Sequence, residues 1–168
     1  CNPDIVLVHG DTSTTLNGAL AAFYNRVPVG HVEAGLRSFD NYSPFPEEMN
    51  RKLTGSITEM HFSPTENNKV NLLNEGINEE KIYITGNTVI DALKSVIKED
   101  YKFEDDSLNK IDFQNKKVVL LTTHRRENWG KPMEDIFLAM TDLLNANEEV
   151  EVIFPMHKNP SIRELAKN

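Results

Sequence analysis

The stretch IVLVHGDTSTTLNGALAAF, residues 5–23, decides the fold class because it joins a strand pattern directly to a helix pattern. Residues 5–8 are a short β-branched and leucine run closed by Gly10, which predicts a buried strand. Asp11 or Thr12 can cap the helix that follows, since both side chains accept hydrogen bonds from backbone N–H groups. Apolar side chains then recur at core-facing helical spacing at Leu16, Ala19, Leu20 and Phe23. The stretch therefore predicts one β-strand followed by one α-helix.

The same alternation of strand and helix continues to the end of the chain. We expect further strands at residues 27–35, 59–64, 81–85, 118–122 and 149–157, and helices at 43–57, 65–75, 86–100, 132–145 and from 159 onward. Residues 102–116 are polar without a clear period, which predicts a loop or a short helix. Alternation with short connections predicts βαβ units, parallel sheets and a doubly wound α/β architecture.

The composition is that of a globular protein. The chain has 168 residues, of which 39% are hydrophobic and 26% are charged, and a chain of this size can bury about 70% of its unfolded surface. The net charge of -8 argues against nucleic-acid binding, which needs a basic face. No apolar run approaches the ~18 residues of a membrane helix. The single cysteine, Cys1, excludes an intrachain disulfide and fits a reducing cytoplasm.

The start of the chain predicts an internal piece of a longer protein. Residues 1–4 (CNPD) include no initiator Met and run almost directly into the first strand. The weakest point of continuity is Gly86-Asn87, where we expect a hinge between two lobes.

Ionisable side chains follow the predicted strands. Ligands of open α/β sheets bind beyond the carboxyl ends of the strands. The segments at this edge are residues 9–12 (HGDT), 33–37 (EAGLR), 86–88 (GNT), 124–127 (HRRE) and 157–160 (HKNP). Arginine forks and helix N-termini bind phosphate oxygens, and carboxylates and histidines transfer protons. Together these groups suit a sugar linked to a diphosphate.

Each of these residues also has a simpler interpretation when it is taken alone. Asp11 can be no more than a helix N-cap. Glu33 can be a solvated carboxylate of a loop, and Glu47 and Arg51, at i,i+4 spacing, can form a surface ion pair. The ionisable residues after the later strands can be ordinary strand-end side chains. Only their common edge makes them a candidate site.

Several other kinds of site lack their sequence patterns. The five histidines form no close pair such as His-x-x-x-His, and cysteine ligands are scarce, which argues against a metal site. The chain has no Gly-x-Gly-x-x-Gly and no Walker loop, so a dinucleotide cofactor or ATP is not supported. It also lacks the Gly-x-Ser-x-Gly elbow of a Ser–His–Asp hydrolase.

Seven motifs, in their order along the chain, resemble those of the non-hydrolysing UDP-N-acetylglucosamine 2-epimerases of bacteria and archaea. These motifs are HGDTSTT, HVEAGLRS, SPFPEEMNRKLTG, HFSPTE, ITGNTVIDAL, THRREN and PMHKNP. The resemblance covers nearly the whole chain apart from the variable residues 98–116.

The resemblance implies the GT-B fold, in which two Rossmann-like lobes hold a nucleotide-sugar between them. Residues 1–86 then correspond to the second half of the N-terminal lobe and residues 87–168 to the first half of the C-terminal lobe. The family's amino-terminal segment with a phosphate-contacting Arg and Lys, its later Asp-Ser-Gly-Gly region and its uridine-holding residues have no counterpart here. We therefore expect residues 1–168 alone to have no activity and weak ligand affinity.

The resemblance also implies an activity. It is the interconversion of UDP-GlcNAc and UDP-ManNAc by inversion at C2, through elimination of UDP to 2-acetamidoglucal and re-addition. It implies no metal and no nicotinamide cofactor, a cytoplasmic enzyme that serves surface polysaccharide biosynthesis, and a homodimer when full length.

The site residues carried over from the family fall into two groups. Asp11, Glu33 and Glu47 match its functional carboxylates, which we interpret as the proton-transfer set without choosing the C2 base. Arg51 and His124 match its functional arginine and histidine, and His124 is expected to contact the UDP diphosphate. In bacterial members a second UDP-GlcNAc binds beside the active site as an allosteric effector. Arg125 and His157 match residues used there, with Glu47 nearby.

Three alternatives stay open. A hydrolysing epimerase would release free ManNAc and UDP. A glycosyltransferase of the GT-B fold would need an acceptor and would not exchange the C2 proton of its substrate alone. A non-catalytic sugar-nucleotide-binding module would tolerate loss of Asp11, Glu33 and His124, whose presence counts against it.

Overall fold

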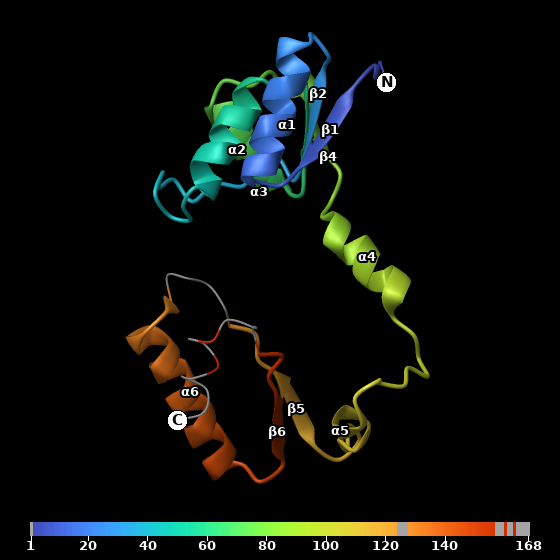
Figure 1. Cartoon of the computed structure of the whole chain (residues 1–168), viewed down its shortest axis with the longest axis vertical. Coiled ribbons are helices and arrows are strands. Elements are labelled where there is room, and N and C mark those ends of the chain that lie inside the picture. The colour runs from blue at the N-terminus through green and yellow to red at the C-terminus, as the bar shows by residue number, and fades with distance from the viewer. Residues whose placement is uncertain (1, 124–127, 157–159, 161–162, 164–168) are drawn as a thin grey trace. The chain divides into compact units, whose positions relative to one another are not determined.

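The computed structural model describes residues 2–123, 128–156, 160 and 163. The chain forms two compact units, residues 1–99 and 100–168 (Figure 1). Both contain parallel β-strands connected through helices, so the α/β class and the alternating order are confirmed. The lobe boundary expected at residues 86 and 87 stays a prediction.

The first unit is built on a four-stranded parallel sheet in the order β1-β2-β3-β4. The strands are β1 (Val6–His9), β2 (Val29–Val32), β3 (Met60–Ser63) and β4 (Ile82–Ile84). Neighbours in the sequence are neighbours in the sheet, and their carboxyl ends therefore meet along one edge. The register sets His31 of β2 opposite His61 of β3.

Helices connect these strands and cover one face of the sheet. α1 (Ser13–Tyr24), α2 (Glu47–Ser56) and α3 (Glu66–Asn74) lie between successive strands. The 3-10 helix η1 (Glu79–Lys81) directly precedes β4, and α4 (Thr88–Val96), which follows β4, has no buried residue. Right-handed crossovers that step in one direction place α1, α2 and α3 on the same face, and α1 packs against α2 (Figure 1). The opposite face carries exposed side chains, among them Leu7 at 62% and Tyr83 at 46% exposure.

The core between α1 and the sheet consists of small and β-branched side chains. Val8 and Val29 of the sheet pack against Ala19 and Ala22 of α1. The expectation that Phe23 faces the core is wrong, because its side chain is 52% exposed. The stripe that faces the sheet is Thr15, Ala19 and Ala22, and Phe23 lies one position beyond it.

Side-chain caps begin several helices where the sequence predicts a helix start. Thr12 is the N-cap of α1, with its Oγ1 accepting a hydrogen bond from the Thr15 N–H at 3.3 Å. Thr65 caps α3 and Asn87 caps α4 in the same way. Thr12, not Asp11, therefore satisfies the start of α1, and the Asp11 carboxylate is left for other contacts.

The second unit contains one βαβ arrangement. Strands β5 (Lys117–Leu120) and β6 (Val150–Ile153) pair in parallel, with α6 (Lys131–Ala146) between them in the chain. The side chain of Met133 in α6 is fully buried. A short helix, α5 (Asp106–Asn109), lies within the polar stretch for which a loop or short helix was expected.

Candidate active site

The end of β1 carries Asp11 into the edge where the strands of the first unit terminate. Gly10 has a φ of +74°, a left-handed conformation that glycine adopts without a steric penalty. The Thr15 hydroxyl donates to the carbonyl of His9 at 2.6 Å, and the Gly10 carbonyl accepts a hydrogen bond from His31 Nε2 at 2.7 Å. The backbone before Asp11 is thus fixed from two sides.

Helix α2 holds both the side chain and the backbone of Asp11. Arg51 donates from Nε and Nη2 to Asp11 Oδ2, at 2.9 and 2.5 Å. The Asn50 amide donates to the Asp11 carbonyl at 2.8 Å. The Arg51 and Asp11 side chains are only 13% and 26% exposed, so this charge-assisted pair is shielded from much of the solvent. Asp11 and Arg51 are therefore brought together, as expected for one site.

The third arm of the Arg51 guanidinium goes to Glu48. Arg51 Nη1 donates to Glu48 Oε2 at 3.0 Å, and the Glu48 side chain is completely buried. The backbone N–H groups of Ser38 and Phe39 also donate to this carboxylate, both at 3.1 Å. The surface ion pair considered for Glu47 and Arg51 is not what the helix forms, because Arg51 turns toward Asp11 and Glu48.

The pKa of Glu48 lies below its ordinary value. Burial alone raises the pKa, since it disfavours the charged form. The hydrogen bonds from the Ser38 N–H, the Arg51 guanidinium and the Phe39 N–H lower it, and together they outweigh burial. Glu48 is therefore a buried carboxylate that is kept ionised by its donors.

Glu33 follows β2 at the same edge. Its φ is +64°, which is uncommon for a residue with a side chain and is often found at functional sites. Glu33 Oε1 lies 3.3 Å from His9 Nε2, and the side chains of Glu33 and His9 are 23% and 57% exposed. A Cβ atom at Gly10 would lie 3.7 Å from Glu33 Oε2. Glu33 thus faces the loop that carries Asp11.

Glu47 is the first residue of α2, where the helix dipole favours a negative charge. Its Oε2 atom is buried and has no hydrogen-bond partner within the described part of the chain. An unsatisfied buried acceptor costs about 1–3 kcal/mol. Such an atom is suited to receive a proton or a hydrogen bond from a bound ligand.

Two buried histidines, His31 of β2 and His61 of β3, lie opposite each other within the sheet. Burial lowers the pKa of His31, although its hydrogen bond to Gly10 raises it. Burial, and after it the charges of His31 and Arg37, lower the pKa of His61 to about 4. Both ring nitrogens of His61 lack a hydrogen-bond partner among the described residues. At neutral pH both side chains are therefore uncharged, and His31 supports the Gly10 backbone as a neutral donor.

The candidate residues of the second unit cannot be placed in the same way. His124, Arg125 and His157 lie outside the residues that the structure describes. The four carried-over residues of the first unit, Asp11, Glu33, Glu47 and Arg51, all follow β1 or β2 or lie in the first turns of α2. Sequence reasoning missed Glu48, whose only signal was a carboxylate at i,i+3 from Arg51.

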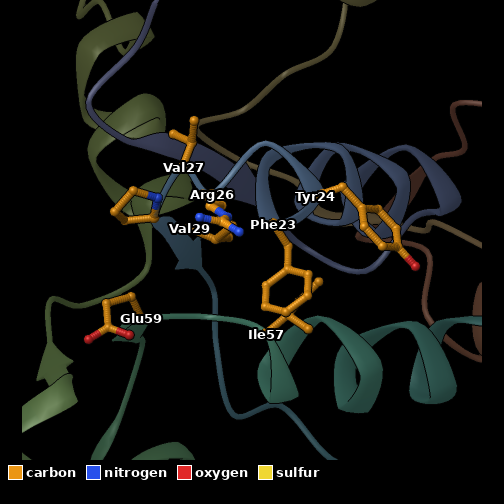
Figure 2. Close-up of a pocket in the computed structure, with 8 residues that line it drawn as sticks. Phe23, Tyr24, Arg26, Val27, Val29, Ile57 and Glu59 are labelled. Carbon is orange, nitrogen blue, oxygen red and sulfur yellow. The ribbon is translucent and has the colours of Figure 1, made fainter.

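A hollow of about 500 Å³ lies at the other edge of the sheet, where β2 and β3 begin. Figure 2 shows the Phe23 ring beside Ile57, with Tyr24, Arg26 and Glu59 around the hollow. Its walls are mainly apolar, and Glu59 is engaged with Lys81 at 3.0 Å. Among the described residues, none of the carried-over candidates Asp11, Glu33, Glu47 and Arg51 lines this hollow.

The described residues include no group of three or more His, Cys, Asp or Glu side chains that could hold a metal ion. Within the same residues, every helix is too short or too polar to cross a membrane. In the described part of the first unit, Arg51 contacts Asp11 and Glu48, and Glu33 contacts His9.

Comparisons with known proteins agree on one family. The family model described as UDP-N-acetylglucosamine 2-epimerase matches residues 1–168. The UDP-N-acetylglucosamine 2-epimerase of Bacillus subtilis (strain 168) is 51% identical over 164 residues, which are 98% of this chain and 42% of that protein. The enzyme of the same name from Escherichia coli (strain K12) is 51% identical over 170 residues, covering 96% of this chain and 44% of its own length.

Solved structures give the same result. The S. aureus MnaA protein, in a co-structure with UDP, has 54% identity and a TM-score of 0.92, covering 98% of this chain and 44% of its own. The UDP-GlcNAc 2-epimerase from Neisseria meningitidis, bound to UDP-GlcNAc, has 43% identity and a TM-score of 0.82, covering 98% of this chain and 46% of its own. The chain thus spans less than half the length of these relatives. With a family model that matches it from end to end, the chain belongs to the UDP-N-acetylglucosamine 2-epimerase family.

Proposed function

We propose that the protein to which this chain contributes interconverts UDP-GlcNAc and UDP-ManNAc by C2 epimerisation, without net hydrolysis. The observation that carries the proposal is the Asp11–Arg51 pair beyond the end of β1, with Glu33 after β2 and Glu47 at the start of α2. The relative from Neisseria meningitidis is bound to UDP-GlcNAc. The match to it over 98% of this chain supports the same class of ligand here.

The reaction has to remove a proton that is hardly acidic, because C2 is not adjacent to a carbonyl group. Elimination solves this problem. The C2–H bond breaks and the proton passes to an enzyme base, while the C2 electron pair forms the C1=C2 bond of 2-acetamidoglucal. The C1–O bond breaks and its electron pair leaves with UDP. In the reverse step a diphosphate oxygen bonds to C1, and an acid delivers a proton to the other face of C2.

Inversion needs proton donors or acceptors on both faces of C2, and the first unit offers three carboxylates in different surroundings. Asp11 is held by Arg51, Glu33 lies beside His9, and Glu47 has a buried oxygen without a hydrogen-bond partner among the described residues. Different surroundings allow one carboxyl group to act as base and another as acid. We assign Asp11, Glu33 and Glu47 to proton transfer and Arg51 to holding Asp11.

The departing diphosphate needs positive or hydrogen-donating groups. We assign this role to His124, and contacts with a second, effector UDP-GlcNAc to Arg125 and His157. We further propose that the full-length protein acts as a homodimer in the cytoplasm and supplies ManNAc units for surface polysaccharide. These assignments rest on motif correspondence.

The test uses a polypeptide as long as the relatives, in which residues 1–168 occupy the positions that they match. We refer to this polypeptide as the full-length enzyme. It is incubated with UDP-GlcNAc, and the products are followed by phosphorus and proton NMR. We expect an equilibrium mixture of UDP-GlcNAc and UDP-ManNAc with the sugar–diphosphate bond retained. Accumulation of free ManNAc and UDP would assign a hydrolysing epimerase instead, and an unchanged substrate would leave the glycosyltransferase or binding-module alternatives.

A further inference from the structure

Glu48 stands out because it is a fully buried carboxylate that shares Arg51 with Asp11, one of the proposed proton-transfer groups. Its relative exposure is 0%. Both of its oxygens accept backbone hydrogen bonds, Oε2 from Ser38 and Oε1 from Phe39. Oε2 also accepts from Arg51. A buried charge is costly unless donors compensate it, and these three donors do so.

The geometry points to Glu48 as a positioning residue that acts through Arg51 on Asp11. A guanidinium group is planar, and its donors keep fixed directions. The Nε and Nη2 atoms of Arg51 bind Asp11, and its Nη1 atom binds Glu48. With two carboxylates on different sides, the plane of the guanidinium cannot turn without breaking one contact. Glu48 thus fixes the direction from which Asp11 is held.

Glu48 also connects this arginine to the loop between β2 and α2. Its partner Phe39 has a φ of +64°, a strained conformation for a residue with a side chain. The two backbone bonds from Ser38 and Phe39 to one carboxylate hold this loop against the first turn of α2. The carboxylate therefore couples the loop that precedes Glu47 to the Arg51–Asp11 pair.

This inference rests on the proposed epimerase function, because positioning is measured as a rate. The experiment compares E48Q, R51K and the double variant E48Q/R51K in the full-length enzyme. Glutamine keeps the shape but loses the charge, and its NH2 group cannot accept a bond. We expect E48Q to lower kcat by about 10- to 100-fold, since small displacements of a reacting group can cost that much, with KM for UDP-GlcNAc changed less than threefold.

The double variant separates positioning from general loss of stability. If Glu48 acts through Arg51, the E48Q change should reduce kcat less than threefold once Lys replaces Arg51, since coupled sites are not additive. The matched control is E75Q, which removes a carboxylate that holds another arginine of the same unit, Arg37. It should leave kcat within twofold of the unmodified enzyme.

Two kinetic results for E48Q would overturn the inference: a kcat within twofold of that of the unmodified enzyme, or E48Q and R51K effects that multiply fully in the double variant. If E48Q does not fold, E48D replaces it. Its shorter carboxylate cannot reach Arg51 and the 38–39 backbone together, so an unchanged kcat in folded E48D would also contradict the inference.

A crystal structure of E48Q gives a readout that does not depend on the reaction. We expect the Arg51 Nε and Nη2 contacts with Asp11 to open beyond hydrogen-bond distance, and an unchanged pair would contradict the inference. If the unmodified full-length enzyme has no epimerase activity, the proposed function fails, and this structure still decides the positioning role of Glu48.

Discussion

Arg37 and Arg51 are two arginines of the same unit that carboxylates hold in different ways. The Arg37 side chain is 1% exposed. It donates from Nε and Nη2 to the two oxygens of Glu75, at 2.6 and 2.7 Å, and from Nη1 to the Leu36 carbonyl at 2.6 Å. This pair connects the loop after β2 to the end of α3, and the Arg37 nitrogens Nε, Nη1 and Nη2 all donate to Glu75 or to the Leu36 carbonyl.

Arg51 is instead shared between two carboxylates from different parts of the chain. Glu48 is buried, whereas Asp11 is 26% exposed at the edge of the sheet. One carboxylate therefore anchors the arginine and the other stays accessible to a ligand. A tight ion pair alone does not indicate a site. Arg51 differs from Arg37 because buried Glu48 anchors it while it holds Asp11, whose carboxylate is partly exposed.

The largest effect is expected when the partly exposed carboxylate of Asp11, the partner of Arg51, is neutralised. In the full-length enzyme, Asp11→Asn should lower kcat by about 10³-fold, within the 10²–10⁴ range of general acid–base catalysis. The measurement is the initial rate of UDP-ManNAc formation by proton NMR. Asp4→Asn, at an exposed position before β1, is the matched control and should retain the full rate. A D11N enzyme with a rate within tenfold of the unmodified one would remove Asp11 from the chemistry.

The buried polar interior near Arg37 predicts a loss of stability in acid. The unfolded chain binds a proton on His61 near the ordinary pKa of 6.5, whereas the folded chain does so only near about 4. The unfolded state therefore binds more protons between these values, and stability present above pH 6.5 is lost as the pH falls toward 4. The full contribution is about 3 kcal/mol, and His31 acts in the same direction because its pKa is also lowered.

Urea unfolding of the full-length enzyme between pH 7 and pH 4 measures this effect, with His61→Leu as the comparison. The difference between the two pH profiles isolates His61 from the carboxylates, which titrate in both proteins. The variant should lose less stability on acidification. Parallel profiles would mean that His61 is not a buried neutral group.

The role of Arg51 can be tested by a substitution that keeps the positive charge but removes the planar set of guanidinium donors. Arg51→Lys retains a cation but cannot donate to Asp11 and Glu48 with the same fixed geometry. We expect kcat to fall by about 10²-fold, as for a misplaced reacting group. Arg26→Lys, at an exposed position of the opposite edge, should be neutral. Equal rates for R51K and R26K would show that charge alone suffices at position 51.

The smallest effect is expected at the Arg37–Glu75 pair, and it concerns stability. Glu75→Gln should lower the free energy of unfolding by about 1–2 kcal/mol, because hydrogen bonds to charged groups contribute about 1.5–3 kcal/mol and Glu75 is partly solvated, at 34% exposure. Glu79→Gln, which breaks the more exposed pair with Lys69, should have a smaller effect. Urea titration distinguishes them. A larger loss in E79Q than in E75Q would reverse the ranking of the two pairs.

Much of the fold follows from local patterns in the sequence. The strand–loop–helix order around Gly10 and Thr12 depends on residues close in the chain, and the structure confirms it. Phe23 was misassigned because its spacing from Ala19 fits a helix stripe as well as Ala22 does. The small side chains of Ala19 and Ala22 let α1 approach the sheet closely, and this packing buries Ala22 rather than Phe23.

The sequence could nominate candidate residues for the site but could not predict their contacts. Asp11 and Arg51 are 40 positions apart, and their hydrogen bonds depend on how α2 is placed over the end of β1. Glu48 was missed because a carboxylate in the first turn of a helix is usually explained by the helix dipole. Its role becomes visible only when its burial and its bonds to Ser38, Phe39 and Arg51 are known.

The most direct test of the assigned chemistry is the fate of the C2 proton. The full-length enzyme is incubated with UDP-GlcNAc in deuterated water, and deuterium at C2 of both UDP-sugars is measured by proton NMR and mass spectrometry. Removal of the proton on one face and delivery from another group on the other face predict deuterium at C2 of the UDP-ManNAc formed, and its near absence with D11N. UDP-ManNAc that retains the original C2 hydrogen would contradict proton transfer by the carboxylates Asp11, Glu33 and Glu47.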